Sequence, residues 1–237
     1  MKLSIIVPVY NEHAHVGELL ERVERTDLSS LGLSKEIIVI DDGSIDGTRE
    51  VLKGFERENR ITLILQDRNR GKGAALRKGF ARSDGDIVLV QDADLEYDPR
   101  EYVKLLSPIV QGKADIVFGS RFIGGEEHRV LFFWHSVGNR FLTLLSNIFT
   151  NLNLTDMEVC YKAFRGSLLR QLELVEDRFG FEPEITAKSA KLAKRVGARI
   201  FEVGVSYNGR TYAEGKKINW KDGVWTFFCI LRYNLLQ

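Results

Sequence analysis

Short runs of β-branched and other apolar residues alternate with longer amphipathic stretches through the first half of the chain. The runs have the length of strands, and the stretches between them have the length of helices. This alternation is typical of βαβ units, which build a mainly parallel sheet with helices on its faces. The sequence therefore predicts a Rossmann-like α/β fold. The expected strands are 3–9, 36–40, 61–65, 86–91 and 114–118, and the expected helices are 13–25, 46–57, 73–83 and 100–111.

The second half of the chain follows a different rhythm, with amphipathic helices at helical spacing separated by shorter apolar runs. No internal repeat and no compositional break marks a linker, so we expect one domain over residues 1–237. The expected elements are helices at 132–150, 182–196 and 220–236, strands at 157–164 and 199–207, and a basic, glycine-containing loop at 208–217.

Charge and cysteine content exclude some classes of function. The 34 Lys and Arg residues are balanced by 33 Asp and Glu residues, so no overall positive field favours nucleic acid as a partner. Cys160 and Cys229 form neither a CxxC pair nor a disulfide framework, which suits the reducing cytoplasm. Because no run of about 18 uninterrupted apolar residues occurs, no segment is expected to cross a bilayer by itself. Peripheral attachment to a membrane surface stays open.

The strongest local signal is Asp92-Ala93-Asp94, which follows an apolar strand and is followed by Glu96. Two carboxylates at this spacing can meet one cation, and few hard oxygen ligands suit Mg²⁺ or Mn²⁺ held largely through phosphates and water. The alternative is a solvated turn or a helix cap, because acidic residues commonly end strands.

Two further strand ends are expected at the same edge of the sheet, where an open parallel sheet binds its ligand. Asp42 and Ser44 follow the second strand, and Pro8, Tyr10 and Glu12 lie at the end of the first. A carboxylate here can accept hydrogen bonds from a base edge or from ribose hydroxyls, and Pro8 with Tyr10 can form an apolar wall. Helix caps and core packing are the alternatives.

The segment Arg70-Gly71-Lys72-Gly73 places small residues and cations at an expected helix start, where free N–H groups attract phosphate or a polar base edge. It fits neither the phosphate loop of nucleotide hydrolases nor the dinucleotide-binding fingerprint, which weakens kinase and dehydrogenase interpretations. The alternative is a glycine-punctuated helix start with surface cations.

Together these motifs resemble the inverting family 2 glycosyltransferases of the GT-A fold. The first strand end, Asp41-Asp42-Gly43-Ser44, Arg70-Gly71-Lys72-Gly73, Asp92-Ala93-Asp94 and Gly119-Ser120-Arg121-Phe122 occur in that order. Within the family the chain is most similar to polyprenyl-phosphate sugar synthases, the dolichyl-phosphate mannose synthase group and its bacterial relatives. The resemblance implies a nucleotide-sugar-binding half at 1–120, an acceptor-binding half at 121–218 and a C-terminal amphipathic helix at 219–237.

The resemblance also implies roles for individual residues. Where relatives often carry Gln and Gly, this chain has Glu96 and Cys160. The implied donor-binding residues are Pro8, Tyr10, Glu12, Asp42, Lys72, Asp92 and Ala93, and the implied ligands of Mg²⁺ or Mn²⁺ are Asp92, Asp94 and Glu96. The implied catalytic residues are Asp94, Arg121, Asp156 and Arg210, and those for the acceptor phosphate are Arg121, Arg129, Lys216 and Lys217.

The activity that the resemblance implies is metal-dependent, inverting transfer of a hexose from a nucleotide-sugar of the GDP-mannose or UDP-glucose type to a polyprenyl or dolichyl phosphate. A phosphate monoester is already largely deprotonated at neutral pH, so this acceptor needs no dedicated base. The alternatives are a glycosyltransferase that uses a saccharide or protein hydroxyl, and a catalytically silent subunit that only binds nucleotide-sugar.

A lipid acceptor also needs apolar surface, and two segments of the second half are rich in aromatic residues. We expect them to contact the cytosolic face of a membrane, with core packing as the alternative and a separate membrane subunit as a further partner. These aromatic residues are Phe132, Phe133 and Trp134 in the first segment and Trp220, Trp225, Phe227, Phe228 and Tyr233 in the second.

Overall fold

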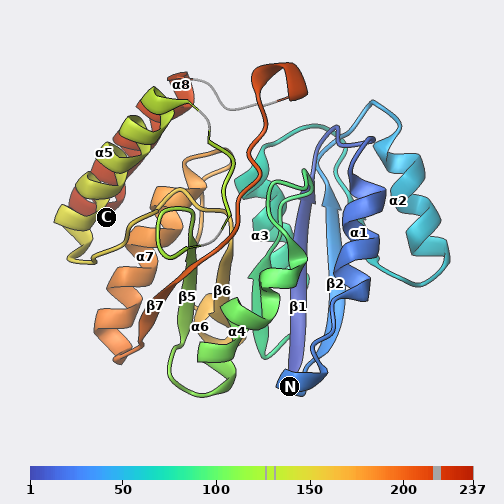
Figure 1. Cartoon of the computed structure of the whole chain (residues 1–237), viewed down its shortest axis with the longest axis horizontal. Helices are drawn as coiled ribbons and strands as arrows, with labels where there is room; N and C mark the ends of the chain where they lie inside the picture. Colours follow the sequence, from blue (N-terminus) through green and yellow to red (C-terminus); the bar gives the residue numbers. More distant parts are fainter. Residues whose placement is uncertain (126, 131, 216–219, 237) are drawn as a thin grey trace.

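The computed structural model of the chain describes residues 1–125, 127–130, 132–215 and 220–236. A seven-stranded sheet runs through the molecule in the order β3-β2-β1-β4-β6-β5-β7, with helices packed around it (Figure 1). Only β6 runs antiparallel to its neighbours among the strands described. The strands are β1 (Lys2–Val9), β2 (Ser34–Asp41), β3 (Thr62–Leu65), β4 (Ile87–Val90), β5 (Ile116–Ser120), β6 (Lys162–Arg165) and β7 (Ile200–Gly204).

The helices pack on both faces of this sheet, and four single turns complete the described structure. Figure 1 shows α2 at one end of the molecule and α5 with α8 at the opposite end. The helices are α1 (Val16–Arg25), α2 (Thr48–Arg57), α3 (Lys72–Arg82), α4 (Tyr102–Val110), α5 (Phe133–Thr150), α6 (Gly166–Leu169), α7 (Phe181–Val196) and α8 (Trp220–Leu231). The turns are η1 (Ser29–Leu31), η2 (Pro99–Glu101), η3 (Tyr212–Glu214) and η4 (Arg232–Leu236).

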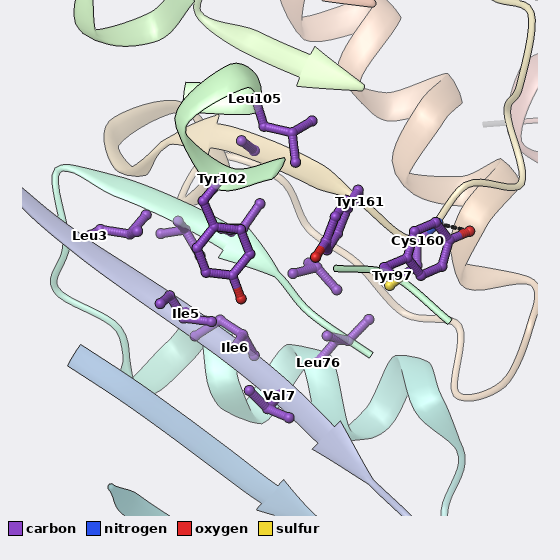
Figure 2. Close-up of a cluster of buried hydrophobic side chains, with 14 of the residues drawn as sticks. Leu3, Ile5, Ile6, Val7, Leu76, Tyr97, Tyr102, Leu105, Cys160 and Tyr161 are labelled. Carbon is purple, nitrogen blue, oxygen red and sulfur yellow. Dashed lines mark hydrogen bonds between the residues drawn. The ribbon is translucent and has the colours of Figure 1, made fainter. Parts of the chain in front are cut away.

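The core explains why the central strands are continuous apolar runs. β1 lies between β2 and β4, so its side chains are buried on both faces, as parallel strands in α/β proteins require. Figure 2 shows Ile5 and Ile6 of β1 between Leu76 of α3 and Tyr102 of α4. All four side chains are fully buried. The expected mainly parallel α/β sheet is thus confirmed.

A buried polar contact fixes the end of β4 against this core. The hydroxyls of Tyr102 and Tyr161 each donate a hydrogen bond of 2.7 Å to Oε1 of Gln91. The Gln91 amide donates in turn to the backbone carbonyl of Asp92 at 2.9 Å. This arrangement holds the first residue of the acidic motif in a defined position.

The strand predicted at 157–164 is wrong in its first part, since only residues from Lys162 onward pair with β4 and β5. The backbone turns there because the buried Lys162 ammonium bonds to the carbonyls of Met157 and Val159, which a strand would direct to its neighbours. The final helix is also shorter than predicted. Its α-helical part ends at Leu231, and a π-helical turn follows.

The amphipathic helix α5 lies with its polar side inward. Thr143 and Ser146 are buried, and the Thr143 hydroxyl accepts a 3.2 Å hydrogen bond from the Met157 amide. Asn147 exchanges two hydrogen bonds with the backbone of Leu154, at 2.7 and 3.1 Å. The apolar stripe consequently faces outward, and its exposed members are Phe133, Val137, Phe141, Leu144 and Ile148. Core packing therefore does not account for this stripe.

Candidate active site

A cleft of about 1100 Å³ lies at the carboxyl ends of β1, β2 and β4 and extends to α5 and α8. This is the edge at which open α/β sheets bind ligands. Most of the residues that sequence reasoning selected line it. Those residues are Pro8, Tyr10, Glu12, Asp42, Lys72, Asp92, Ala93, Asp94, Glu96, Arg121 and Arg210.

The acidic motif after β4 projects its carboxylates in different directions. The Lys72 ammonium contacts Asp92 Oδ1 at 2.9 Å, whereas the Arg210 guanidinium donates to Asp94 Oδ2 at 3.0 Å. Leu95, which follows Asp94, has a φ of 61°, in the left-handed region that is unfavourable for a leucine. Such strain is typical of functional sites, where the surrounding structure enforces it.

Burial and the neighbouring charges of Asp92 and Glu96 raise the pKa of Asp94 to about 7. A cation would relieve this repulsion, and carboxylate oxygens are the ligands that Mg²⁺ and Mn²⁺ prefer. Within the described ranges no three His, Cys, Asp or Glu side chains form a complete metal cage. The donor set therefore fits a divalent ion that takes most of its remaining ligands from phosphate and water.

Arg210 connects the late loop to the cleft. Its guanidinium donates to both carboxylate oxygens of Glu12 at 3.2 Å as well as to Asp94. Its backbone amide donates to Glu96 Oε1 at 2.8 Å, and the Tyr207 hydroxyl donates to Glu96 Oε2 at 3.0 Å. Glu96 thus anchors residues 207–210 in this structure, while its expected role as a metal ligand stays a prediction.

Sequence reasoning missed a buried charge network beneath Lys72. Glu182, at the start of α7, contacts the Lys72 ammonium at 3.3 Å and also pairs with Lys162, which is fully buried. Although burial disfavours the charged form, Asp92 and Glu182 hold the pKa of Lys72 well above its usual value. The residues that flank Lys162 in the sequence are aromatic residues and an alanine, and they do not indicate that its ammonium is buried.

Asp42 holds the backbone that precedes α3. Its carboxylate accepts hydrogen bonds from the amides of Arg70 and Gly71, at 2.8 and 2.7 Å. Burial raises the pKa of Asp42, although these amide bonds oppose the shift. The side chain lines the cleft and at the same time shapes the loop from which Lys72 projects.

The expectation that the α3 N-terminus offers free N–H groups to phosphate is only partly met. The Ala74 amide donates to the backbone carbonyl of Asp177 at 3.0 Å. A Cβ at Gly71 would lie 2.4 Å from that carbonyl oxygen, and one at Gly73 would lie 2.2 Å from the carbonyl oxygen of Glu176. Both glycines are therefore required by the approach of this distant segment.

Arg121 and Asp156 form a two-pronged ion pair, with Nε–Oδ2 at 2.6 Å and Nη2–Oδ1 at 2.7 Å. Burial works against ionisation of Asp156, but Arg121 outweighs it and lowers the pKa of this carboxyl. Arg121 lines the cleft, and Asp156 lies fully buried outside the set of cleft-lining residues. Asp156 therefore holds the Arg121 guanidinium from behind the cleft.

Of the other cations expected at the acceptor phosphate, the structure describes only Arg129. Arg129 does not line the cleft, because its guanidinium pairs with Glu214 at 2.7 Å and donates to the Gly209 carbonyl. Arg129 thereby connects the loop after β5 to the late loop that contains Gly209 and Glu214. Lys216 and Lys217 lie outside the described residues.

The end of the cleft away from β1 and β2 is formed by α5 and α8, which pack against each other. Trp134 and Leu142 line it from α5, and Trp220 and Thr226 line it from α8. Farther along the two helices, the rings of Phe141 and Phe227 are stacked with centroids 6.5 Å apart. The cleft is therefore highly charged at one end and bordered by exposed aromatic helices at the other.

The cleft combines the Asp92 and Asp94 carboxylates with the cations Lys72, Arg121 and Arg210. A comparison of the sequence with known protein families agrees with this site. The sequence model of glycosyl transferase family 2 matches residues 4–173 of this chain. The chain belongs to glycosyl transferase family 2. Family membership was therefore predicted correctly from the motifs.

Two curated relatives of this family 2 chain have names that state an activity. An undecaprenyl-phosphate 4-deoxy-4-formamido-L-arabinose transferase of Pseudomonas paraeruginosa is 32% identical over 90% of this chain and 60% of its own length. A dolichol-phosphate mannosyltransferase of Pyrococcus furiosus is 30% identical over 92% of this chain and 61% of its own length. The chain thus spans about 60% of the length of these curated relatives.

Crystal structures of glucosyl-3-phosphoglycerate synthase from Mycobacterium tuberculosis share the fold. One, with Mn²⁺, UDP and glucosyl-3-phosphoglycerate, has a TM-score of 0.72 at 20% identity, over 98% of this chain and 80% of that one. Another, with Mg²⁺ and UDP, has a TM-score of 0.70 at 19% identity, over 98% of this chain and 79% of that one. The expected GT-A fold is confirmed.

Proposed function

We propose that this chain is a metal-dependent, inverting glycosyltransferase that transfers a sugar, a hexose on the sequence prediction, from a nucleotide-sugar to a polyprenyl phosphate. The observation that carries the proposal is the continuity of one cleft from the Asp92 and Asp94 carboxylates, past Arg121, to the aromatic helices α5 and α8. The names of the two relatives, which refer to undecaprenyl phosphate and dolichol phosphate, support it.

The donor would occupy the charged end of the cleft. Pro8, Tyr10 and Asp42 border its nucleoside part, and Lys72 and Arg210 lie where the diphosphate would reach β4. The charge that develops on the departing diphosphate would be offset by Mg²⁺ or Mn²⁺ held on Asp92 and Asp94. Lys72 and Arg210, now paired with these carboxylates, would turn to the phosphates.

The acceptor phosphate would lie at Arg121. The guanidinium is held by Asp156 and lies over the Tyr207 ring, 5.1 Å from its centroid, so its position is fixed before a substrate arrives. A phosphate oxygen is already anionic at neutral pH, so it can attack the anomeric carbon without a base. Asp156 does not line the cleft, which agrees with an acceptor that needs no base.

The lipid part of the acceptor would follow α5 and α8 to a membrane surface. Trp134 and Trp220, at the cleft, are 78% and 75% exposed, and Phe133 next to Trp134 is 69% exposed. Exposed aromatic groups of this kind favour insertion at a headgroup boundary. None of the described helices is both long and apolar enough to span a bilayer. From the exposed aromatic groups we propose peripheral attachment at the cytosolic leaflet, with a separate membrane subunit as a further partner.

A competition between acceptors tests this proposal. The purified chain is incubated with a radiolabelled nucleotide-sugar and Mg²⁺ or Mn²⁺, in the presence of a short isoprenyl phosphate, the corresponding isoprenol or a free saccharide. We expect a labelled lipid product with the phosphate only. Transfer to the saccharide would support a hydroxyl acceptor instead, and donor binding without any product would support a silent subunit.

A further inference from the structure

Two buried side-chain oxygen atoms that belong to cleft-lining residues lack a hydrogen-bond partner among the residues that the structure describes. They are Oε1 of Glu158 and Oδ1 of Asn139. Glu158 belongs to the segment just before β6, and Asn139 belongs to α5. An unsatisfied buried polar atom costs free energy, and one that faces a binding cleft is expected to be satisfied by the ligand.

The sheet order places β6, which Glu158 closely precedes in the sequence, between the two regions proposed to bind phosphate. β4, which carries Asp92 and Asp94 at its end, is followed in the sheet by β6 and then by β5, which precedes Arg121. In the proposed reaction the donor diphosphate lies at β4 and the acceptor phosphate lies at Arg121. The group that must lie between these two phosphates is the sugar that is transferred.

The chemistry of the two side chains favours sugar hydroxyls over a further phosphate. Asn139 donates its amide N–H to Asp156 Oδ1 at 3.1 Å, so its unpartnered oxygen can only accept. A phosphate oxygen is also an acceptor and would not satisfy it, whereas a hydroxyl both donates and accepts.

The carboxyl of Glu158 can supply the hydrogen-bond donor that the Asn139 oxygen lacks. Burial, with added repulsion from Glu182, raises the pKa of Glu158 to about 8. At neutral pH its carboxyl is therefore mainly protonated and has an O–H to donate and a carbonyl oxygen to accept. A neutral acid of this kind can pair with a hydroxyl without placing another negative charge beside the diphosphate.

We propose that Glu158 and Asn139 form the subsite for the hydroxyl groups of the transferred sugar, and that Glu158 contributes to the choice of sugar. This inference rests on the proposed function, because it assumes a nucleotide-sugar in the cleft. It assigns Glu158 a binding role and requires no bond-making step at its carboxyl.

Calorimetric titration of nucleoside diphosphate and of nucleotide-sugar separates this role from general damage. UDP, UDP-glucose, GDP and GDP-mannose are titrated, each with Mn²⁺, into the wild type, Glu158→Gln and Glu158→Leu. Glu50→Leu, on the exposed surface of α2, is the matched control. We expect Glu158→Leu to weaken nucleotide-sugar binding about tenfold while the diphosphate binds as in the wild type. Glu158→Gln, which keeps a donor and an acceptor, should stay within about threefold.

Equal binding of the nucleotide-sugar to wild type and Glu158→Leu would overturn the inference, as would equal weakening of both ligands. If Glu158→Leu does not fold, Glu158→Thr is compared in the same way. A wild type that binds none of the four ligands would overturn the proposed function itself, so the two failures give different results.

Discussion

The carboxylate of Asp156 holds the guanidinium of Arg121 through two hydrogen bonds of 2.6 and 2.7 Å and accepts a third from the Arg121 backbone amide. Arg121 faces the cleft while Asp156 is enclosed behind it. The motif residue that the resemblance associates with catalysis therefore lies behind its own partner and does not line the cleft.

Replacement of Asp156 should thus act through Arg121. We expect Asp156→Asn to destabilise the protein by about 3 kcal/mol, because it leaves a buried guanidinium without its counter-charge. The KM for the phosphate acceptor should rise at least tenfold, as Arg121 loses its fixed position. Thermal unfolding and steady-state kinetics measure both effects. A variant with wild-type stability and acceptor KM but a low kcat would instead indicate that Asp156 takes part in the chemistry.

The Lys162–Glu182 pair is buried, and Glu182 also lines the cleft. Removal of one member leaves the other charge buried alone, so Glu182→Leu should cost roughly 3–5 kcal/mol in the free energy of unfolding. The double variant Glu182→Leu/Lys162→Met should recover a large part of that loss, since neither charge is then left. Urea unfolding of the single and double variants tests this coupling. Simple additivity of the two single effects would show that the pair is not coupled.

Several features of the site could be predicted from the sequence, and others could not. Strand ends and acidic spacing located Asp92 and Asp94, because both signals are local. The position of Lys162 depends on Glu182, which lies 20 residues away. The glycines of Arg70-Gly71-Lys72-Gly73 pack against the distant segment 176–177. Periodicity likewise detected α5 without showing its orientation, because core and surface stripes have the same spacing.

The pH dependence of stability should reveal the environment of Glu158. Charged groups face it from α7 (Glu182), from β6 (Lys162) and from the segment after β5 (Arg121), and Asp156 lies in its own loop. The pKa of Glu158 rises from 4.5 to about 8 on folding, so between these pH values the folded protein binds more protons than the unfolded chain. Its stability contribution therefore falls as the pH rises through that window.

Glu158→Gln removes this titration. We expect wild type and variant to unfold at similar temperatures at pH 5, and the variant to be more stable by roughly 1–3 kcal/mol at pH 8. Differential scanning calorimetry in the presence of a chelator measures the difference in stability between the two proteins. Groups that titrate equally in both proteins do not contribute to this difference. A stability difference that is the same at both pH values would contradict the predicted environment.

The exposed aromatic residues of α5 should control attachment to lipid. Phe133→Ser should reduce cosedimentation with vesicles of anionic phospholipid several-fold, since it removes a large apolar side chain that is 69% exposed. Phe201→Ser, on β7 and 41% exposed, is the matched control and should bind as the wild type does. Substitution is preferable to deletion of α8 and η4, because Trp225 and Tyr233 donate hydrogen bonds to Glu176 and a deletion would remove those contacts. Equal loss of binding in both variants would contradict a membrane role for α5.

The central claim is that Asp92 and Asp94 hold the divalent ion on which sugar transfer depends. The most direct measurement is the rate of transfer from nucleotide-sugar to a short isoprenyl phosphate, with and without Mg²⁺ or Mn²⁺, for wild type, Asp94→Asn and the exposed-loop control Asp67→Asn. We predict metal-dependent transfer by wild type and control, and a loss of at least a hundredfold in Asp94→Asn. Full transfer by Asp94→Asn, or by the wild type in excess chelator, would contradict the account.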